Sequence, residues 1–179
     1  MIPAGFVRLL SQADILSGAK AVADRLRPQI KPGATTFVAV LDGALFFLTD
    51  LIQELAMDVK VDFLRVSSYD GGETSGDLKL VSGLMSNVAG ADVVLVDDIL
   101  DSGKTLAFCT DYLKSRGAAS VRGVVLLAKE RPRLAAIEEP AVGFHIPDRF
   151  VIGYGLDWQG RYRHLREIFI KDAEKETPR

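Results

Sequence analysis

The densest group of chemically useful side chains follows a run of apolar residues from Val93 to Val96. Two adjacent carboxylates, Asp97 and Asp98, come directly after this run, and Asp101 follows three residues later. Carboxylates this close repel one another unless a divalent cation or sugar hydroxyl groups lie against them. The turn from Ser102 to Thr105 is small and rich in hydroxyl groups, and at the start of a helix its backbone N–H groups can hold a phosphate dianion. The string therefore predicts a cation or sugar site beside a phosphate site.

Spacing argues against two common nucleotide motifs. The run from Ser102 to Thr105 ends like a P-loop, but a P-loop needs a glycine five residues before its second glycine, and here that position holds Asp98. The Gly-x-Gly-x-x-Gly string of dinucleotide-binding folds follows none of the predicted strands. Both a nucleoside triphosphatase and a dinucleotide-dependent enzyme are therefore disfavoured.

Apolar periodicity indicates the elements that must position these side chains. Strand-length apolar runs, and helical spacing of the apolar residues that follow them, predict units in which a strand precedes a helix. Strands are expected over 36–41, 59–63, 78–81, 93–96 and 121–128, and helices over 12–27, 44–55 and 103–116. A polar stretch over 67–77, dense in glycine and serine, predicts a long loop between two of these strands.

Alternating strands and helices indicate an α/β fold, with a mostly parallel twisted sheet flanked by helices on both faces. Ligands bind at the carboxyl ends of the strands in such sheets. Asp42 and Gly43, residues 97–105 and Lys129 each follow a predicted strand, so we expect them to share one rim of the sheet.

Composition limits the class of protein. A chain of 179 residues that is 48% hydrophobic and 26% charged fits one globular domain over 1–179. A net charge of −2 with scattered lysines and arginines gives no attraction to nucleic acid. The chain also lacks a leader-like start and an apolar run of about 18 residues, so we expect no membrane partner and a cytoplasmic location.

The string from Val93 to Thr105 resembles the 5-phosphoribosyl-1-pyrophosphate (PRPP) motif of type I phosphoribosyltransferases. Four further strings are similar to segments of this family, in the family's order. Leu41 to Ala44 resembles the pyrophosphate loop, and residues 67–77 resemble the mobile catalytic loop. Leu127 to Lys129 and Asp148 to Asp157 resemble the purine-binding segments of the hypoxanthine-guanine type. The resemblance implies a type I phosphoribosyltransferase fold with a small hood built from about 1–10 and 132–170.

The resemblance also implies roles around the phosphoribosyl donor. The adjacent residues Asp97 and Asp98, which we call the acid pair, engage the ribose hydroxyls, partly through Mg²⁺, and the turn after them binds the 5′-phosphate. Pyrophosphate is bound by a loop, by a second Mg²⁺ and by a nearby cation. The residues matched to ribose are Asp97 and Asp98, and those matched to the 5′-phosphate are Ser102, Gly103, Lys104 and Thr105. Those matched to pyrophosphate are Asp42, Gly43, Arg163 and Asp157, the last as the ligand of the second Mg²⁺.

On the purine side, the resemblance places Asp101 beside N7, where it acts as a general base or stabilises the departing proton. Lys129 matches the residue that donates a hydrogen bond to the purine O6. Phe150 matches an aromatic that stacks on the base, although a plain core position is the alternative, and Val151 reads the base edge through its backbone. The remaining matches, on the mobile loop, are catalytic residues Ser68 and Tyr69.

A Mg²⁺-dependent purine salvage enzyme is the function that the resemblance implies. It would convert hypoxanthine and/or guanine with PRPP into IMP or GMP and pyrophosphate, as a homodimer or homotetramer. One alternative is a non-catalytic nucleotide-binding regulator on the same fold, although such proteins usually show a basic face or a DNA-binding segment. The other is a phosphoribosyltransferase for a different base, such as xanthine or uracil.

Asp42 is the clearest departure from the family pattern, since many relatives carry lysine at this place. In the family the peptide before this residue can be cis, which turns backbone N–H groups toward pyrophosphate. We therefore expect the N–H groups of Asp42 to Ala44 to line the pyrophosphate pocket. The Asp42 carboxylate should point away from it or be held by a nearby cation.

Overall fold

The structure of the chain is a computed structural model that describes residues 2–68 and 78–172. Tyr69 and most of the stretch matched to the mobile loop lie outside the described residues. Of Ser68, the structure gives only the backbone, as the last residue of a strand.

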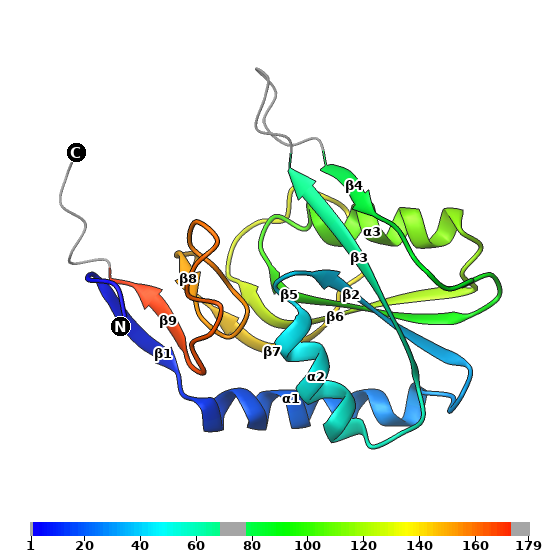
Figure 1. Cartoon of the computed structure of the whole chain (residues 1–179), viewed down its shortest axis with the longest axis horizontal. Coiled ribbons are helices and arrows are strands. Elements are labelled where there is room, and N and C mark those ends of the chain that lie inside the picture. Colours follow the sequence, from blue (N-terminus) through cyan, green and yellow to red (C-terminus); the bar gives the residue numbers. More distant parts are fainter. Residues whose placement is uncertain (1, 69–77, 173–179) are drawn as a thin grey trace.

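A six-stranded sheet with the order β4-β3-β2-β5-β6-β7 forms the centre of the molecule (Figure 1). Five of its strands run parallel, and β4 pairs with β3 in the antiparallel direction. Its strands are β2 (Thr35–Leu41), β3 (Lys60–Ser68), β4 (Leu78–Ser82), β5 (Asp92–Leu100), β6 (Ser120–Lys129) and β7 (Ala141–Ile146). The prediction of a mostly parallel sheet is confirmed.

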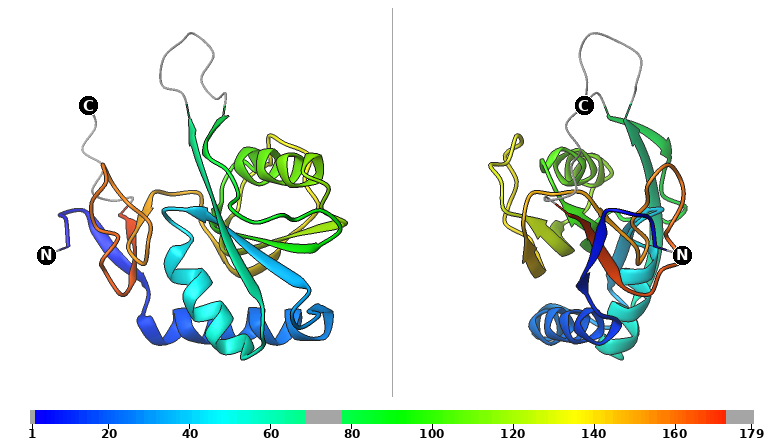
Figure 2. Two further views of the ribbon diagram at one scale, coloured as in Figure 1. Left: turned by 45° about the vertical axis from the view of Figure 1, so that its right-hand side comes forward. Right: turned by 90° about the vertical axis from the view of Figure 1, so that its left-hand side faces the viewer.

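Helices cover both faces of this sheet, as predicted. On one face lie α1 (Gln12–Leu26), the short 3-10 helix η1 (Arg27–Gln29) and α2 (Leu45–Leu55), and on the opposite face lies α3 (Lys104–Ser115) (Figures 1 and 2). Ser11 caps α1 because its side chain accepts from the Asp14 N–H while the Asp14 carboxylate accepts from the Ser11 N–H. None of the described helices has the length and apolar character needed to cross a bilayer.

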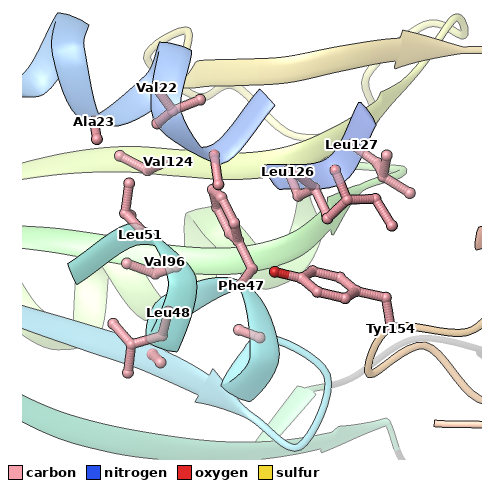
Figure 3. Close-up of a cluster of buried hydrophobic side chains, with 14 of the residues drawn as sticks. Val22, Ala23, Phe47, Leu48, Leu51, Val96, Val124, Leu126, Leu127 and Tyr154 are labelled. Carbon is pink, nitrogen blue, oxygen red and sulfur yellow. The ribbon is translucent and has the colours of Figure 1, made fainter. Parts of the chain in front are cut away.

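The larger apolar core lies between the sheet and the pair formed by α1 and α2. Figure 3 shows Phe47 of α2 packed among side chains from α1, the sheet and a loop near the C-terminus. The labelled residues are Val22, Ala23, Phe47, Leu48, Leu51, Val96, Val124, Leu126, Leu127 and Tyr154. A second core on the other face packs α3 against β2 and β5. Burial on both faces explains why the central strands read as continuous apolar runs instead of alternating ones.

A separate three-stranded antiparallel sheet lies beside the main sheet, and we call it the hood sheet (Figure 1). Its strands, in spatial order, are β1 (Phe6–Leu10), β9 (Ile168–Lys171) and β8 (Val151–Ile152). The sequence did not lead us to expect β1, which is short and lacks a clean apolar alternation, or β7, in which Val142, Phe144 and Ile146 alternate with small or polar residues. Because β7 pairs with β6, the range 132–170 assigned to the hood wrongly includes a strand of the main sheet.

The strand that carries the acid pair is longer than predicted. It was expected to end at Val96, but β5 continues to Leu100 because Ile99 and Leu100 pair with β6. The acid pair therefore lies within a strand and not in a turn after it, and its backbone is held by the sheet.

One buried carboxylate organises the segment between β4 and β5. Asp62 of β3 is 5% exposed. It accepts hydrogen bonds from the backbone N–H groups of Phe63 at 2.8 Å, Met85 at 3.0 Å and Ser86 at 2.7 Å, and from the Ser86 hydroxyl. Burial raises the pKa of Asp62, but these hydrogen bonds together outweigh burial and leave the pKa below its ordinary value.

Asp62→Asn should lower the free energy of unfolding by about 1 to 2 kcal/mol at neutral pH, because an amide replaces an anion that accepts several hydrogen bonds. Since the folded-state pKa is lowered, the stabilisation is present above the ordinary carboxyl pKa and is lost as the pH falls through the folded value. The difference in the free energy of unfolding between the parent and the variant should therefore become smaller at acid pH. Urea unfolding at neutral pH and at acid pH checks this, with Asp111→Asn on the exposed side of α3 as the control. An equal difference in the free energy of unfolding at the two pH values would contradict it.

Candidate active site

A cavity of about 310 Å³ opens at the carboxyl ends of β2 and β5. Ten residues singled out in the sequence line it, from three separate segments of the chain. They are Asp42, Gly43, Asp97, Asp98, Asp101, Ser102, Gly103, Thr105, Asp157 and Arg163. The expectation of one shared rim is therefore met for the segments after β2 and β5, and the loop before β9 adds two members.

The acid pair is electrostatically strained. Burial raises the pKa of Asp97 well above its ordinary value, and the adjacent Asp98 carboxylate raises it further. Burial also raises the pKa of Asp98. The Asp98 N–H donates to Asp97 Oδ1 at 3.0 Å, which offsets only part of this cost. Two negative charges are therefore unfavourable here, and a cation against the pair would relieve them.

Two glycines, Gly43 and Gly155, allow close packing among the loop after β2, the acid pair and the loop between β8 and β9. A Cβ atom on Gly43 would lie 1.7 Å from Asp98 Oδ2. One on Gly155, whose φ is +95°, would lie 2.2 Å from the Gly43 carbonyl oxygen. These contacts place the loop after β2 directly against the acid pair and against the loop that carries Asp157.

The loop after β2 follows the expectation in part. The peptide between Leu41 and Asp42 is cis, and both Asp42 and Gly43 line the cavity. The prediction is wrong for Ala44, which is fully buried and whose N–H donates to the Val40 carbonyl at 3.3 Å. Helix α2 begins directly after Ala44, so its N–H is used to close the turn into that helix.

The Asp42 carboxylate is held by nearby cations, which confirms that expectation. Its Oδ1 forms an ion pair with Arg65 of β3, and its Oδ2 lies 4.0 Å from Arg163 Nη2. The same Arg163 nitrogen lies 2.9 Å from Asp157 Oδ1. Sequence reasoning missed Arg65; its position near the carboxyl end of β3, on the same rim, was the available signal.

The turn before α3 has the form of an anion nest. Gly103 is the N-cap of α3 with a φ of +85°, a backbone conformation that favours glycine. The N–H of Lys104 donates weakly to Ser102 Oγ at 3.4 Å. The side chain of Lys104 is exposed and does not line the cavity, unlike Ser102, Gly103 and Thr105.

Asp101 and Lys129 contact one another directly at the edge of the cavity. Lys129 Nζ lies 2.6 Å from Asp101 Oδ2 and 3.6 Å from Asp148 Oδ1. Arg131 Nη1 lies 2.8 Å from Asp101 Oδ1 and 3.6 Å from Asp148 Oδ2. We call these four residues the charge ring. It unites the end of β5, the end of β6 and the turn before β8.

Two members of the charge ring, Arg131 and Asp148, had no assigned role in the sequence analysis. Lys129 ends β6 and Arg131 lies in the bend that follows, where its N–H donates to the Lys129 carbonyl at 3.0 Å. Both side chains contact Asp101, so they point to the same side, and two cations this close in the sequence were the available signal. Arg133, also missed, fixes the backbone below the ring. Its Nη1 donates to the carbonyl oxygens of Asp101 at 2.8 Å and Lys129 at 2.9 Å.

An aromatic cluster supports the other predicted base contact. Phe150 is 44% exposed, so the alternative of a plain core residue is wrong. Phe6 of β1 packs edge-on against it, with ring centroids 6.3 Å apart, and also contacts Trp158 at 5.8 Å. Val151 is 5% exposed as the first residue of β8. Phe6 was not anticipated, because β1 was not predicted as a strand.

Comparison with known proteins places this site in a family. Residues 8–159 match the phosphoribosyl transferase domain. The hypoxanthine-guanine phosphoribosyltransferase of Bacillus subtilis is 38% identical over 163 residues, which cover 90% of this chain and 91% of that protein. The chain belongs to the hypoxanthine-guanine phosphoribosyltransferase family.

Two further relatives show how much of the chain the similarity covers. A crystal structure of a hypoxanthine phosphoribosyltransferase from Staphylococcus aureus matches with a TM-score of 0.87 and 36% identity, over 96% of this chain and 94% of that one. The bifunctional protein TilS/HprT of Listeria innocua is 40% identical over 93% of this chain, but the chain spans only 26% of that longer protein. The type I phosphoribosyltransferase fold predicted from the sequence is thus confirmed.

Proposed function

We propose that this phosphoribosyltransferase joins hypoxanthine and/or guanine to C1 of PRPP, producing IMP or GMP and pyrophosphate. The observation that carries the proposal is the cavity that gathers the acid pair, the anion nest and the loop after β2, with Asp101 and Lys129 at its edge. Acids, an anion nest and cations are the groups that a sugar bearing a phosphate and a pyrophosphate requires. Membership of the family supports the same assignment.

In the donor half of the site, Asp97 and Asp98 would engage the ribose hydroxyls, and Ser102, Gly103, Lys104 and Thr105 the 5′-phosphate. Backbone groups of Asp42 and Gly43 would line the place of pyrophosphate, beside Arg163. This division assigns each charged group of the donor to a segment that lines the cavity, apart from the exposed Lys104 side chain.

Mg²⁺ fits the carboxylates that the cavity provides. Within residues 2–68 and 78–172, no three histidine, cysteine or acidic side chains are grouped to hold a metal ion. Mg²⁺ is commonly held by one or two carboxylates, with substrate oxygens and water completing its shell. Asp97 and Asp98 would hold one ion and Asp157 a second. Bound there, Mg²⁺ would neutralise charge on the departing pyrophosphate.

In the purine half, Asp101 would receive or stabilise the N7 proton as the glycosidic bond forms. Lys129 would donate to O6, Phe150 would stack on the base and the Val151 backbone would read its edge. Loss of pyrophosphate leaves a sugar with oxocarbenium character, which water would capture unless excluded. We assign that exclusion to the segment containing Ser68 and Tyr69, on the family resemblance.

The decisive experiment is a spectrophotometric assay of the purified chain with PRPP, Mg²⁺ and each of hypoxanthine, guanine, xanthine, adenine and uracil. Nucleotide should form with hypoxanthine or guanine. Turnover with xanthine or uracil alone would favour an enzyme for another base. Nucleotide binding without turnover of any base would favour a non-catalytic regulator.

The assembly state is part of the proposal. The family resemblance implies a homodimer or homotetramer in the cytoplasm. Leu45 and Phe46 at the start of α2 are 43% and 40% exposed, and adjacent exposed apolar residues favour a protein contact there. Light scattering during gel filtration should give a mass at least twice that of one chain.

Asp42→Asn should tighten the inhibition of the reaction by pyrophosphate by up to about fivefold. The variant frees Arg65 and Arg163 from a carboxylate, and an ion pair this exposed is worth at most about 1 kcal/mol. The inhibition constant of pyrophosphate measures the effect, and Asp111→Asn on α3 is the control. A tenfold weakening would show that the carboxylate itself supports pyrophosphate binding.

A further inference from the structure

Each carboxylate of the charge ring uses both of its oxygen atoms, one for each cation. Asp101 accepts from Lys129 through Oδ2 and from Arg131 through Oδ1. Asp148 faces Lys129 with Oδ1 and Arg131 with Oδ2, both at 3.6 Å. Charges therefore alternate around the ring, and neither carboxylate depends on one cation alone.

This arrangement meets a problem that the proposed reaction creates. Lys129 Nζ has three N–H donors, but its 2.6 Å contact with Asp101 lengthens if the ammonium turns toward a purine oxygen. The ring then holds one of its two cations less tightly. Two neighbouring carboxylates would then repel one another, and Asp101 would lose the contact that sets its position.

The remaining cation is well placed to prevent this. Arg131 approaches the oxygen of each carboxylate that Lys129 does not use, so its contacts survive the departure of Lys129. Its Nε atom is buried, and packing therefore restrains the guanidinium. Arg133 holds the carbonyls of Asp101 and Lys129 together, so the change is confined to side chains.

We propose that Arg131 is a positioning residue that keeps Asp101 and Asp148 in place while Lys129 engages the purine oxygen. The inference rests on the proposed function. The two cations then have different roles, since Lys129 is the mobile donor to the base and Arg131 is the fixed counter-ion of the carboxylates. Arg131 acts through Asp101 and needs no contact with the substrates.

Kinetics of Arg131→Gln and Arg131→Lys test the proposal, with Arg116→Gln at the far end of α3 as the control. The glutamine variant should lose about tenfold in kcat, because a catalytic group displaced by a fraction of an ångström costs rate. Its KM for PRPP should stay within about twofold, since the donor half is untouched. The lysine variant should recover most of kcat, because only one guanidinium nitrogen faces both carboxylates and a point charge can replace it.

A general structural role would give a different pattern. It would lower the unfolding midpoint and would leave the lysine variant as impaired as the glutamine variant. That pattern, or a glutamine variant with the parent's kcat, overturns the role of Arg131 and leaves the proposed function standing. A parent chain that is inactive with every base overturns the proposed function, and the role of Arg131 with it.

Discussion

Replacing Asp101 with asparagine should lower kcat by about 10²-fold or more, while the KM for PRPP stays close to that of the parent. Asparagine keeps the size of the side chain but cannot carry the charge that we propose receives or stabilises the N7 proton. The loss should fall on kcat because proton transfer belongs to the transition state. Asp101 lines the cavity with the acid pair and the anion nest, where we propose that the base joins the sugar.

Asp148→Asn is the matched control for this variant. Asp148 faces the same two cations as Asp101, yet it does not line the cavity formed by the described residues. Losing its charge disturbs Lys129 and Arg131 without removing a group from the reacting atoms, so we expect a loss below about tenfold. Equal losses in both variants would mean that the ring's charge balance, and not proton transfer, limits the rate. An Asp101→Asn enzyme within a factor of two of the parent would remove Asp101 from the mechanism.

The sequence predicted most of what positions the donor half of the site. The strand before Asp42 and the part of β5 before Asp97 are buried on both faces, and their continuous apolar runs predict strands of this kind. Ser11 and Asp14 together marked the start of α1. The short strand β1 was not predicted because its residues form no clean alternation and its pairing partner lies far away along the chain. In β7, Val142, Phe144 and Ile146 do alternate with small or polar residues, but this short pattern was not read as a strand.

The purine half was less predictable, because its chemistry depends on pairings between distant segments. Asp101 and Lys129 were each singled out, but no local pattern shows that they form an ion pair across 28 residues of separation. The same holds for Asp42 and Arg65, 23 residues apart. Local sequence fixes which element a side chain lies on; the register of the parallel sheet decides which side chains meet.

Gly43 illustrates the difference. In the sequence it is part of the string that resembles the pyrophosphate loop, so a substrate pyrophosphate was the expected neighbour. In the structure the nearest atom to a hypothetical Cβ is Asp98 Oδ2 at 1.7 Å. The glycine therefore accommodates the acid pair first, and it ties the position of the pyrophosphate loop to that of the proposed ribose and metal ligands.

Lys129→Ala should weaken capture of a 6-oxopurine by roughly 1.5 to 3 kcal/mol, or about 10- to 150-fold, the range for a hydrogen bond from a charged donor. The Lys129 side chain is only 12% exposed, so water can replace the lost donor poorly. Because Lys129 also contacts Asp101, some of the loss should fall on kcat as well as on the KM for the base. The KM for PRPP should hardly change, since the donor half is separate.

Unsubstituted purine, which lacks the O6 atom, separates the loss of the contact with O6 from the loss of the contact with Asp101 in the Lys129→Ala variant. The parent and the variant should bind it with similar affinity, because no oxygen is present for Lys129 to contact. Lys114→Ala, on the exposed side of α3, controls for loss of a lysine as such. If the variant's KM for hypoxanthine matches the parent's, the purine oxygen is read elsewhere. If purine and hypoxanthine are weakened equally, Lys129 serves the charge ring alone, and discrimination of the 6-position must come from another group.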